Sequence, residues 1–103
     1  MQVVNQNNFE EEVLKSTVPV ILDFWSTWCP PCNAMMPVLD RLALELNGVA
    51  KICKVNHEEN PELATSHNIM ALPTFVFYKD GKQLEQRIVG MTTPAKLKEV
   101  LNV

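Results

Sequence analysis

Hydrophobic and polar positions along the chain form a repeating strand and helix pattern. A nearly all-apolar run over residues 18–25, rich in β-forming side chains, predicts a central strand covered on both faces. Over residues 32–46 the apolar positions recur at spacings of four, three and four, which predicts an amphipathic helix ended by an Asn-Gly pair. Runs at 52–55 and 74–78 predict two further strands, and Val3 and Val4 allow a brief one near the start.

The starts of three shorter helices are marked by polar residues that favour helix caps. Asn7 or Asn8 is expected to cap a helix over residues 9–14, with glutamates in its first turn. Asn60 and Thr93 are each followed by proline, which is favoured at the first helical position. We therefore expect a short helix after Asn60 and a closing helix after Thr93.

The segment 79–82, with sequence Lys-Asp-Gly-Lys, predicts a tight hairpin, because Asp-Gly accepts the positive φ values of such a turn. The strand over residues 83–89 should then run antiparallel to the strand before it. The resulting order of elements is typical of an α/β fold, with a mixed sheet of about five strands, crossover connections and four helices on both faces. Residues 1–103 are long enough for a single domain with one modest core.

Composition narrows the possible partners and compartments. The net charge is −3 and the basic residues are scattered, which argues against nucleic acid. Apolar runs such as 18–22 fall far short of the ~20 residues that span a bilayer. The residues after Met1 show no basic start, apolar block or cleavage site, so the cytoplasm is the expected compartment. His57 and His67 lie in polar surroundings and are expected at the surface.

The chemistry-bearing feature is Cys29-Pro30-Pro31-Cys32, placed where the apolar strand ends and the long helix begins. A thiolate at a helix N-terminus faces unpaired N–H groups and the positive end of the helix dipole, so Cys29 is expected to be the attacking thiol. Cys32 lies one turn further on, where it is less open to solvent and close enough to form a disulfide with Cys29. It is the expected resolving thiol in a cycle that passes through a mixed disulfide with a client.

Asp23 is a single carboxylate inside the apolar strand, and it shares a face with Ile21 and Trp25. We expect the helix that follows the cysteines to cover this face and to bury Asp23 behind them. Burial raises the pKa of a carboxylate, which suits a general base that takes the proton of Cys32.

Several motifs agree in order and spacing with the thioredoxin family over almost the whole chain. They are Asp23-Phe24-Trp25, Trp28-Cys29-x-Pro31-Cys32, Pro37, Leu72-Pro73-Thr74 and Gly90. The resemblance implies the thioredoxin fold and a redox-active Cys29–Cys32 disulfide that needs no cofactor. It also implies a monomer that accepts electrons from a flavin-dependent thioredoxin reductase and passes them to disulfide-containing clients, such as peroxide-reducing or nucleotide-reducing enzymes.

The resemblance also points to residues around the cysteines. Lys54 matches a family lysine on the neighbouring strand, opposite the carboxylate. Pro73 matches a family proline preceded by a cis peptide bond, which would turn the Leu72 backbone outward to pair with an extended client segment. We expect a client-binding surface around the cysteines that comprises Trp28, Ala71, Leu72, Pro73, Gly90 and Met91.

The dipeptide between the cysteines departs from the family, in which Gly-Pro is usual. Pro30 removes one amide N–H that would solvate the Cys29 thiolate, yet it also stiffens the loop. The redox potential is therefore open at this point, and a member poised as an oxidase or isomerase is an alternative to a reductant.

Two other classes of function compete with redox chemistry. Cys29, Cys32, Cys53 and His57 can be drawn as a Cys3His zinc site. Residues four apart in a strand are separated by about 13 Å, however, which opposes a shared ion unless the strand ends directly after Cys53. A binding module without redox activity is opposed by the presence of both cysteines. Cys53 itself is expected to pack as a small apolar side chain.

Overall fold

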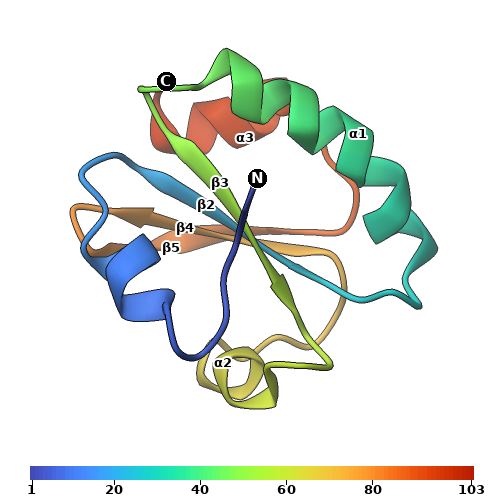
Figure 1. Cartoon of the computed structure of the whole chain (residues 1–103). Helices are drawn as coiled ribbons and strands as arrows, with labels where there is room; N and C mark the ends of the chain where they lie inside the picture. Colours follow the sequence, from blue (N-terminus) through green and yellow to red (C-terminus); the bar gives the residue numbers. More distant parts are fainter.

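Five strands form one mixed sheet in the computed structural model, which describes residues 1–103 (Figure 1). The strands are β1 (Gln2–Val3), β2 (Val20–Trp25), β3 (Lys51–Asn56), β4 (Thr74–Lys79) and β5 (Lys82–Val89). Their order in the sheet is β1-β3-β2-β4-β5. β1, β3 and β2 are parallel, whereas β4 runs antiparallel to β2 and β5 antiparallel to β4. The predicted α/β class and mixed sheet are confirmed.

Four helices connect the strands. They are the short π-helix η1 (Glu10–Leu14) and the α-helices α1 (Pro30–Glu45), α2 (Pro61–Ser66) and α3 (Pro94–Leu101). The longest is α1, with 16 residues. None of the helices combines the length and the apolar character that crossing a lipid bilayer would require.

The helices lie on both faces of the sheet, so each face has its own core. In Figure 1, α1 and α3 lie together on one side of the strands, and α2 lies on the other. Along β2, Ile21 packs against the leucines of α1 and α3, whereas Leu22 and Phe24 pack on the side of η1 and α2. Asp23 follows the parity of Ile21 and therefore lies on the face that α1 covers, as predicted.

The β4–β5 hairpin turns at Asp80 and Gly81, which have φ angles of 54° and 76°. Positive φ at both central residues is what a two-residue turn between right-twisted strands requires. A Cβ atom at Gly81 would also lie 2.7 Å from the carbonyl oxygen of Leu14, so only glycine fits there. The predicted hairpin is confirmed.

The predicted cap of the first short helix is wrong. Phe9, not Asn7 or Asn8, precedes η1, and no side chain caps that helix. The Asn8 side chain is used in the preceding turn instead, where its Oδ1 accepts the Asn5 N–H at 2.8 Å and its Nδ2 donates to the Val3 carbonyl at 3.1 Å.

Asn60 does stand at the N-cap position of α2, but its side chain makes no capping bond. Its Oδ1 instead accepts the Gln6 N–H at 3.2 Å, and its Nδ2 donates to the Asn56 carbonyl at 3.1 Å. These bonds tie the N-terminal segment to the loop after β3. At α3 the expected start is found, since Thr93 Oγ1 accepts the Lys96 N–H at 3.3 Å.

The prediction that His67 lies at the surface is wrong. His67 is 5% exposed and packs among the rings of Phe9, Phe24 and Tyr78. Its Nδ1 donates to the Leu63 carbonyl at 2.8 Å, which leaves Nε2 to accept the Tyr78 hydroxyl at 2.7 Å. Both ring nitrogens are satisfied in the neutral form, and burial lowers the pKa of His67.

Candidate active site

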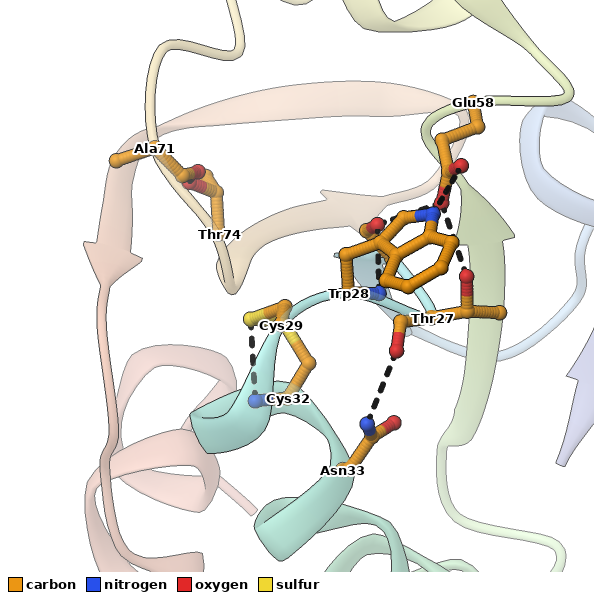
Figure 2. The surroundings of a disulfide bond; sticks show 9 residues. Thr27, Trp28, Cys29, Cys32, Asn33, Glu58, Ala71 and Thr74 are labelled. Atoms are coloured by element: carbon orange, nitrogen blue, oxygen red, sulfur yellow. Dashed lines mark hydrogen bonds between the residues drawn. A yellow bond between two sulfur atoms is a disulfide. The ribbon is translucent and has the colours of Figure 1, made fainter.

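A disulfide joins Cys29 and Cys32 at the start of α1, with their Cα atoms 5.2 Å apart (Figure 2). Cys29 is the N-cap residue and has extended backbone angles, while Pro30 and Pro31 occupy the first two helical positions. Cys29 Sγ accepts the Cys32 N–H at 3.2 Å. The sulfur of Cys29 thus takes the place that a serine or aspartate oxygen fills in an ordinary helix cap.

The two cysteines differ in access to solvent. Cys29 keeps 9% of its surface exposed, whereas Cys32 keeps 1%. Cys32 is the first member of the buried stripe of α1, which continues through Met35 and Leu39. That stripe packs on the sheet face that carries Ile21 and Asp23. Cys32 therefore faces the interior, and Cys29 is the sulfur that a partner can reach.

Asp23 is 1% exposed, and its Oδ1 has no hydrogen-bond partner. Burial raises the pKa of Asp23 to about 7, against a partial lowering by the Lys54 charge. A buried carboxyl group with a pKa near neutral exchanges protons readily at physiological pH. Its position under α1 is the one predicted from the pattern of β2.

Lys54 lies on β3 with its Cα directly opposite that of Asp23. Its side chain is half-buried, and its Nζ lies 5.4 Å from the centroid of the Trp25 ring. Lys54 and Trp25 also line a polar cavity of about 620 Å³ at the end of β1 and β3, together with Asn56 and Asn60. Lys54 is thus a neighbour of Asp23, as expected, and Trp25 forms part of the cavity wall.

Trp28 is 82% exposed, yet its indole is held in place by Glu58 (Figure 2). The indole N–H donates to Glu58 Oε2 at 3.0 Å, and Glu58 Oε1 accepts the hydroxyls of Ser26 at 2.6 Å and Thr27 at 3.2 Å. These hydrogen bonds, above all that from Ser26, lower the pKa of Glu58. Glu58 is not among the residues predicted from the sequence.

The order of the strands indicates that the residues after β3 lie close to those after β2. β2 and β3 are parallel neighbours, so the residues that follow them meet at one edge of the sheet. Three hydrogen-bond donors follow β2, and an acidic pair follows β3.

A groove of about 470 Å³ opens beside Cys29. Its walls are formed by Pro30 and Pro31, by His57, and by the loop 69–72. Met70 in this loop is 94% exposed. Of the predicted client-binding residues, Ala71 and Leu72 line this groove together with Cys29. His57 was expected at the surface, but it is half-buried and lines the same groove.

The loop that faces Cys29 offers free backbone groups. The Leu72–Pro73 peptide bond is cis, as the family resemblance implies. Thr74 Oγ1 donates to the Ala71 carbonyl at 2.6 Å, whereas no hydrogen bond uses the N–H or C=O of Leu72. Figure 2 shows the segment from Ala71 to Thr74 across from Cys29.

The remaining predicted residues lie around this centre without lining the groove. Pro73 is buried, and its carbonyl accepts the Gly90 N–H at 2.8 Å. Gly90 has a φ of 88°, a conformation that side chains other than glycine rarely adopt. Met91 and Trp28 are exposed, and neither is among the residues that line the groove.

The residues of the alternative zinc site are not brought together. Cys53 is fully buried in the core on the η1 and α2 side of the sheet, on the opposite face from the one that α1 and Cys32 cover. No group of three or more His, Cys, Asp or Glu side chains has the proximity that a metal ion requires. Burial raises the pKa of Cys53 to about 11, so its thiol stays protonated, as expected of an apolar core side chain.

Comparisons with known proteins cover the chain from end to end. A family model described as Thioredoxin matches residues 1–103. A protein named "Thioredoxin" from Rickettsia bellii is 38% identical over 99 residues, which span 96% of this chain and 93% of the relative. "Thioredoxin 1" from a Nostoc species is 39% identical over 98 residues, 95% of this chain and 91% of the relative. "Thioredoxin M-type, chloroplastic" from Spinacia oleracea is 42% identical over 97 residues, 94% of this chain and 53% of that protein.

Proposed function

This chain belongs to the thioredoxin family, and we propose that it reduces protein disulfides, with Cys29 as the attacking thiol and Cys32 as the resolving thiol. As a member of that family it is a thiol-disulfide oxidoreductase, an electron carrier whose redox group is a disulfide of its own side chains. The observation that carries the assignment of roles is the N-cap position of the Cys29 sulfur beside an open groove.

The first step is the attack of the Cys29 thiolate on a client disulfide. The thiolate is stabilised by the Cys32 N–H and by the positive end of the α1 dipole. A bond forms between Cys29 Sγ and one client sulfur, and the bond between the two client sulfurs breaks. The second client sulfur leaves with the electron pair.

The second step releases the client. Asp23 accepts the proton of Cys32, directly or through water, and the Cys32 sulfur attacks Cys29 Sγ. Support for this role of Asp23 comes from its burial under α1 and from its pKa, which burial raises to about 7, so that the carboxyl group takes up and releases a proton near neutral pH. The Cys29–Cys32 disulfide is restored and the client leaves as a dithiol.

Client binding is assigned to the groove and to the loop opposite Cys29. The unpaired N–H and C=O groups of Leu72 suit the addition of an extended client segment as a short strand. Ala71 and the exposed side chains of Trp28 and Met91 supply apolar contact area around it. Gly90 keeps the approach free of a side chain, and Pro73 fixes the loop through its bond to Gly90.

The Pro30-Pro31 dipeptide favours the reductant over the oxidase or isomerase alternative. Proline at both positions leaves the Cys32 N–H as the single backbone donor to Cys29 Sγ. A family oxidant is strongly oxidising because its reduced form is stabilised. With fewer donors the Cys29 thiolate is stabilised less, which supports a more reducing couple for this CPPC site.

The proposed electron donor is a flavin-dependent thioredoxin reductase, and the proposed clients are disulfide-containing proteins such as peroxide-reducing or nucleotide-reducing enzymes. We place the chain in the cytoplasm as a monomer with one domain, residues 1–103, and without nucleic acid or membrane as partners.

Reduction of insulin tests the proposed function. With dithiothreitol or with NADPH and a thioredoxin reductase as electron source, the protein should accelerate insulin precipitation, and Cys29→Ser should abolish the acceleration. A wild-type protein that leaves the rate at the dithiothreitol background would refute the proposal. Equilibration with glutathione buffers then gives the redox potential of the Cys29–Cys32 couple. A strongly oxidising potential would favour the oxidase or isomerase alternative.

A further inference from the structure

His57 is placed beside the reactive sulfur by the end of β3. Its backbone N–H donates to the Trp25 carbonyl at 2.8 Å, which extends the pairing of β2 and β3 by one residue. His57 is half-buried, and it is one of the residues that line the groove, together with Cys29 and the loop 69–72. His57 therefore lies in the groove to which client binding is assigned.

The imidazole has no partner within the chain. No hydrogen bond or ion pair of the structure uses either ring nitrogen of His57. His67, by contrast, uses both of its ring nitrogens in the core. Only the imidazole of His57 is free to interact with a bound molecule.

His57 is also the single proton-donating side chain of the groove other than Cys29. The other residues that line the groove have apolar side chains, and they are Pro30, Pro31, Ile69, Met70, Ala71 and Leu72. A lone polar group in an apolar pocket commonly fixes how a bound molecule reacts or is oriented. Asp23 lies under α1 and is not among the groove residues, so it is not placed to serve a client sulfur.

Thiol-disulfide exchange creates a need for a proton at this place. When Cys29 attacks, the departing client sulfur carries a full negative charge unless a proton reaches it, and exchange is slower when the leaving thiol has a high pKa. An alkyl thiol such as cysteine is a poor leaving group in this sense. The apolar walls of the groove make an isolated thiolate less favourable still.

We propose that His57 is a general acid that protonates the client thiol as it leaves, a role that rests on the disulfide reductase function proposed above. The Cys29 thiolate forms a bond to one client sulfur. The electrons of the broken S–S bond pass to the second client sulfur, which takes the proton from the imidazolium of His57. The neutral imidazole then regains a proton from water, so that the step balances without any additional redox reagent.

The test compares two disulfides in single-turnover reactions of the pre-reduced protein. One is an aromatic disulfide, 5,5′-dithiobis(2-nitrobenzoate), whose acidic arylthiol leaves readily as an anion. The other is bis(2-hydroxyethyl) disulfide, whose alkyl thiol benefits from protonation. His57→Gln removes the acid and keeps a polar side chain of similar size. It should slow the alkyl reaction ~10-fold or more and leave the aryl rate within about twofold.

The aryl rate also serves as the internal standard for folding. An equal effect on both disulfides, whether none or a common loss, would overturn the proposal. His57→Asn should repeat the selective loss. Glu59→Gln changes a charge two residues away, outside the groove, and should keep the wild-type ratio of the two rates. A shift of the ratio in Glu59→Gln as large as that in His57→Gln would assign the effect to general charge and contradict the proposal. A wild-type protein that reduces neither disulfide would refute the reductase function itself.

Discussion

Lys54 and Asp23 are direct neighbours across β3 and β2, but no ion pair joins them. The ammonium of Lys54 lies over the Trp25 ring, where a cation is attracted to the π electrons. The positive charge of Lys54 consequently acts on the Asp23 carboxyl group only from a longer distance, and burial is the main influence on its pKa. This separation keeps the pKa of Asp23 near 7 instead of below its ordinary value.

The first prediction concerns the pH dependence of stability. Because the pKa of Asp23 rises from 3.8 to about 7 on folding, the folded state holds a proton that the unfolded state has lost. The free energy of unfolding of the oxidised protein should therefore fall as the pH rises from about 4 to 7. Asp23→Asn removes this loss. The free energy of unfolding of Asp23→Asn, relative to that of the wild type, should therefore increase by about 3 kcal/mol between pH 5 and pH 8.

Urea unfolding of both oxidised proteins at the two pH values measures this difference. Lys54→Met serves as a companion variant, because removing the positive charge should raise the pKa of Asp23 above its value in the wild type. A stability difference between Asp23→Asn and the wild type that does not change with pH would contradict the account of the carboxyl group.

The second prediction concerns the resolving thiol. Cys32→Ser keeps the attacking sulfur and should form mixed disulfides with clients that are not released, because no second thiol displaces them. Non-reducing electrophoresis of the variant with a disulfide client should show the covalent complex. Cys29→Ser, in which the remaining thiol is 1% exposed, should show none. Equal amounts of complex with both variants would assign the attack to the wrong sulfur.

The third prediction concerns the missing amide donors. Pro31→Ala restores an N–H at the second helical position, from which it can donate to Cys29 Sγ alongside the Cys32 N–H. One added hydrogen bond to a thiolate should stabilise the reduced form and make the couple about 30 mV more oxidising. Glutathione equilibration of wild type and variant gives both potentials. A shift toward a more reducing potential would show that amide donors do not control this site.

The fourth prediction concerns the support of Trp28. Glu58→Gln keeps an acceptor for the indole but loses the negative charge that now binds three donors. The exposed indole should become more mobile, seen as a faster decay of Trp28 fluorescence anisotropy in a Trp25→Phe background. The KM for insulin should rise a few-fold while the chemical step is preserved. Unchanged anisotropy would show that Glu58 does not position the indole.

Local sequence signals were sufficient for most of the fold. The Asp80-Gly81 turn depends only on the φ preferences of two residues, and it is found as predicted. The regular spacing of apolar residues in α1 predicted the helix, and the apolar run of β2 predicted the central strand. The alternation of side chains along that strand predicted the face on which Asp23 lies. The order of these elements then left few topologies, and the observed sheet is the expected one.

The features that sequence analysis missed depend on contacts between distant segments or on competition among polar side chains. Glu58 reaches Trp28 across the ends of two strands, and His57 and Cys29 line one groove together with the distant loop 69–72. The Asn8 side chain was expected to cap the first short helix, but its Oδ1 accepts the N–H of Asn5 instead. His67 is the C-cap residue of α2 and follows the buried Leu63 by four residues, a spacing that brings two side chains to one side of a helix, but its polarity led to the wrong prediction of a surface position.

The central claim is that the Cys29 sulfur is the reactive and reachable one, and competitive alkylation tests it directly. The reduced native protein is treated at pH 7 with less than one equivalent of iodoacetamide, and the three thiols are then mapped by mass spectrometry. We predict modification of Cys29 well ahead of Cys32, with Cys53 protected inside the core. Preferential modification of Cys32 or Cys53, or equal labelling of Cys29 and Cys32, would contradict the account.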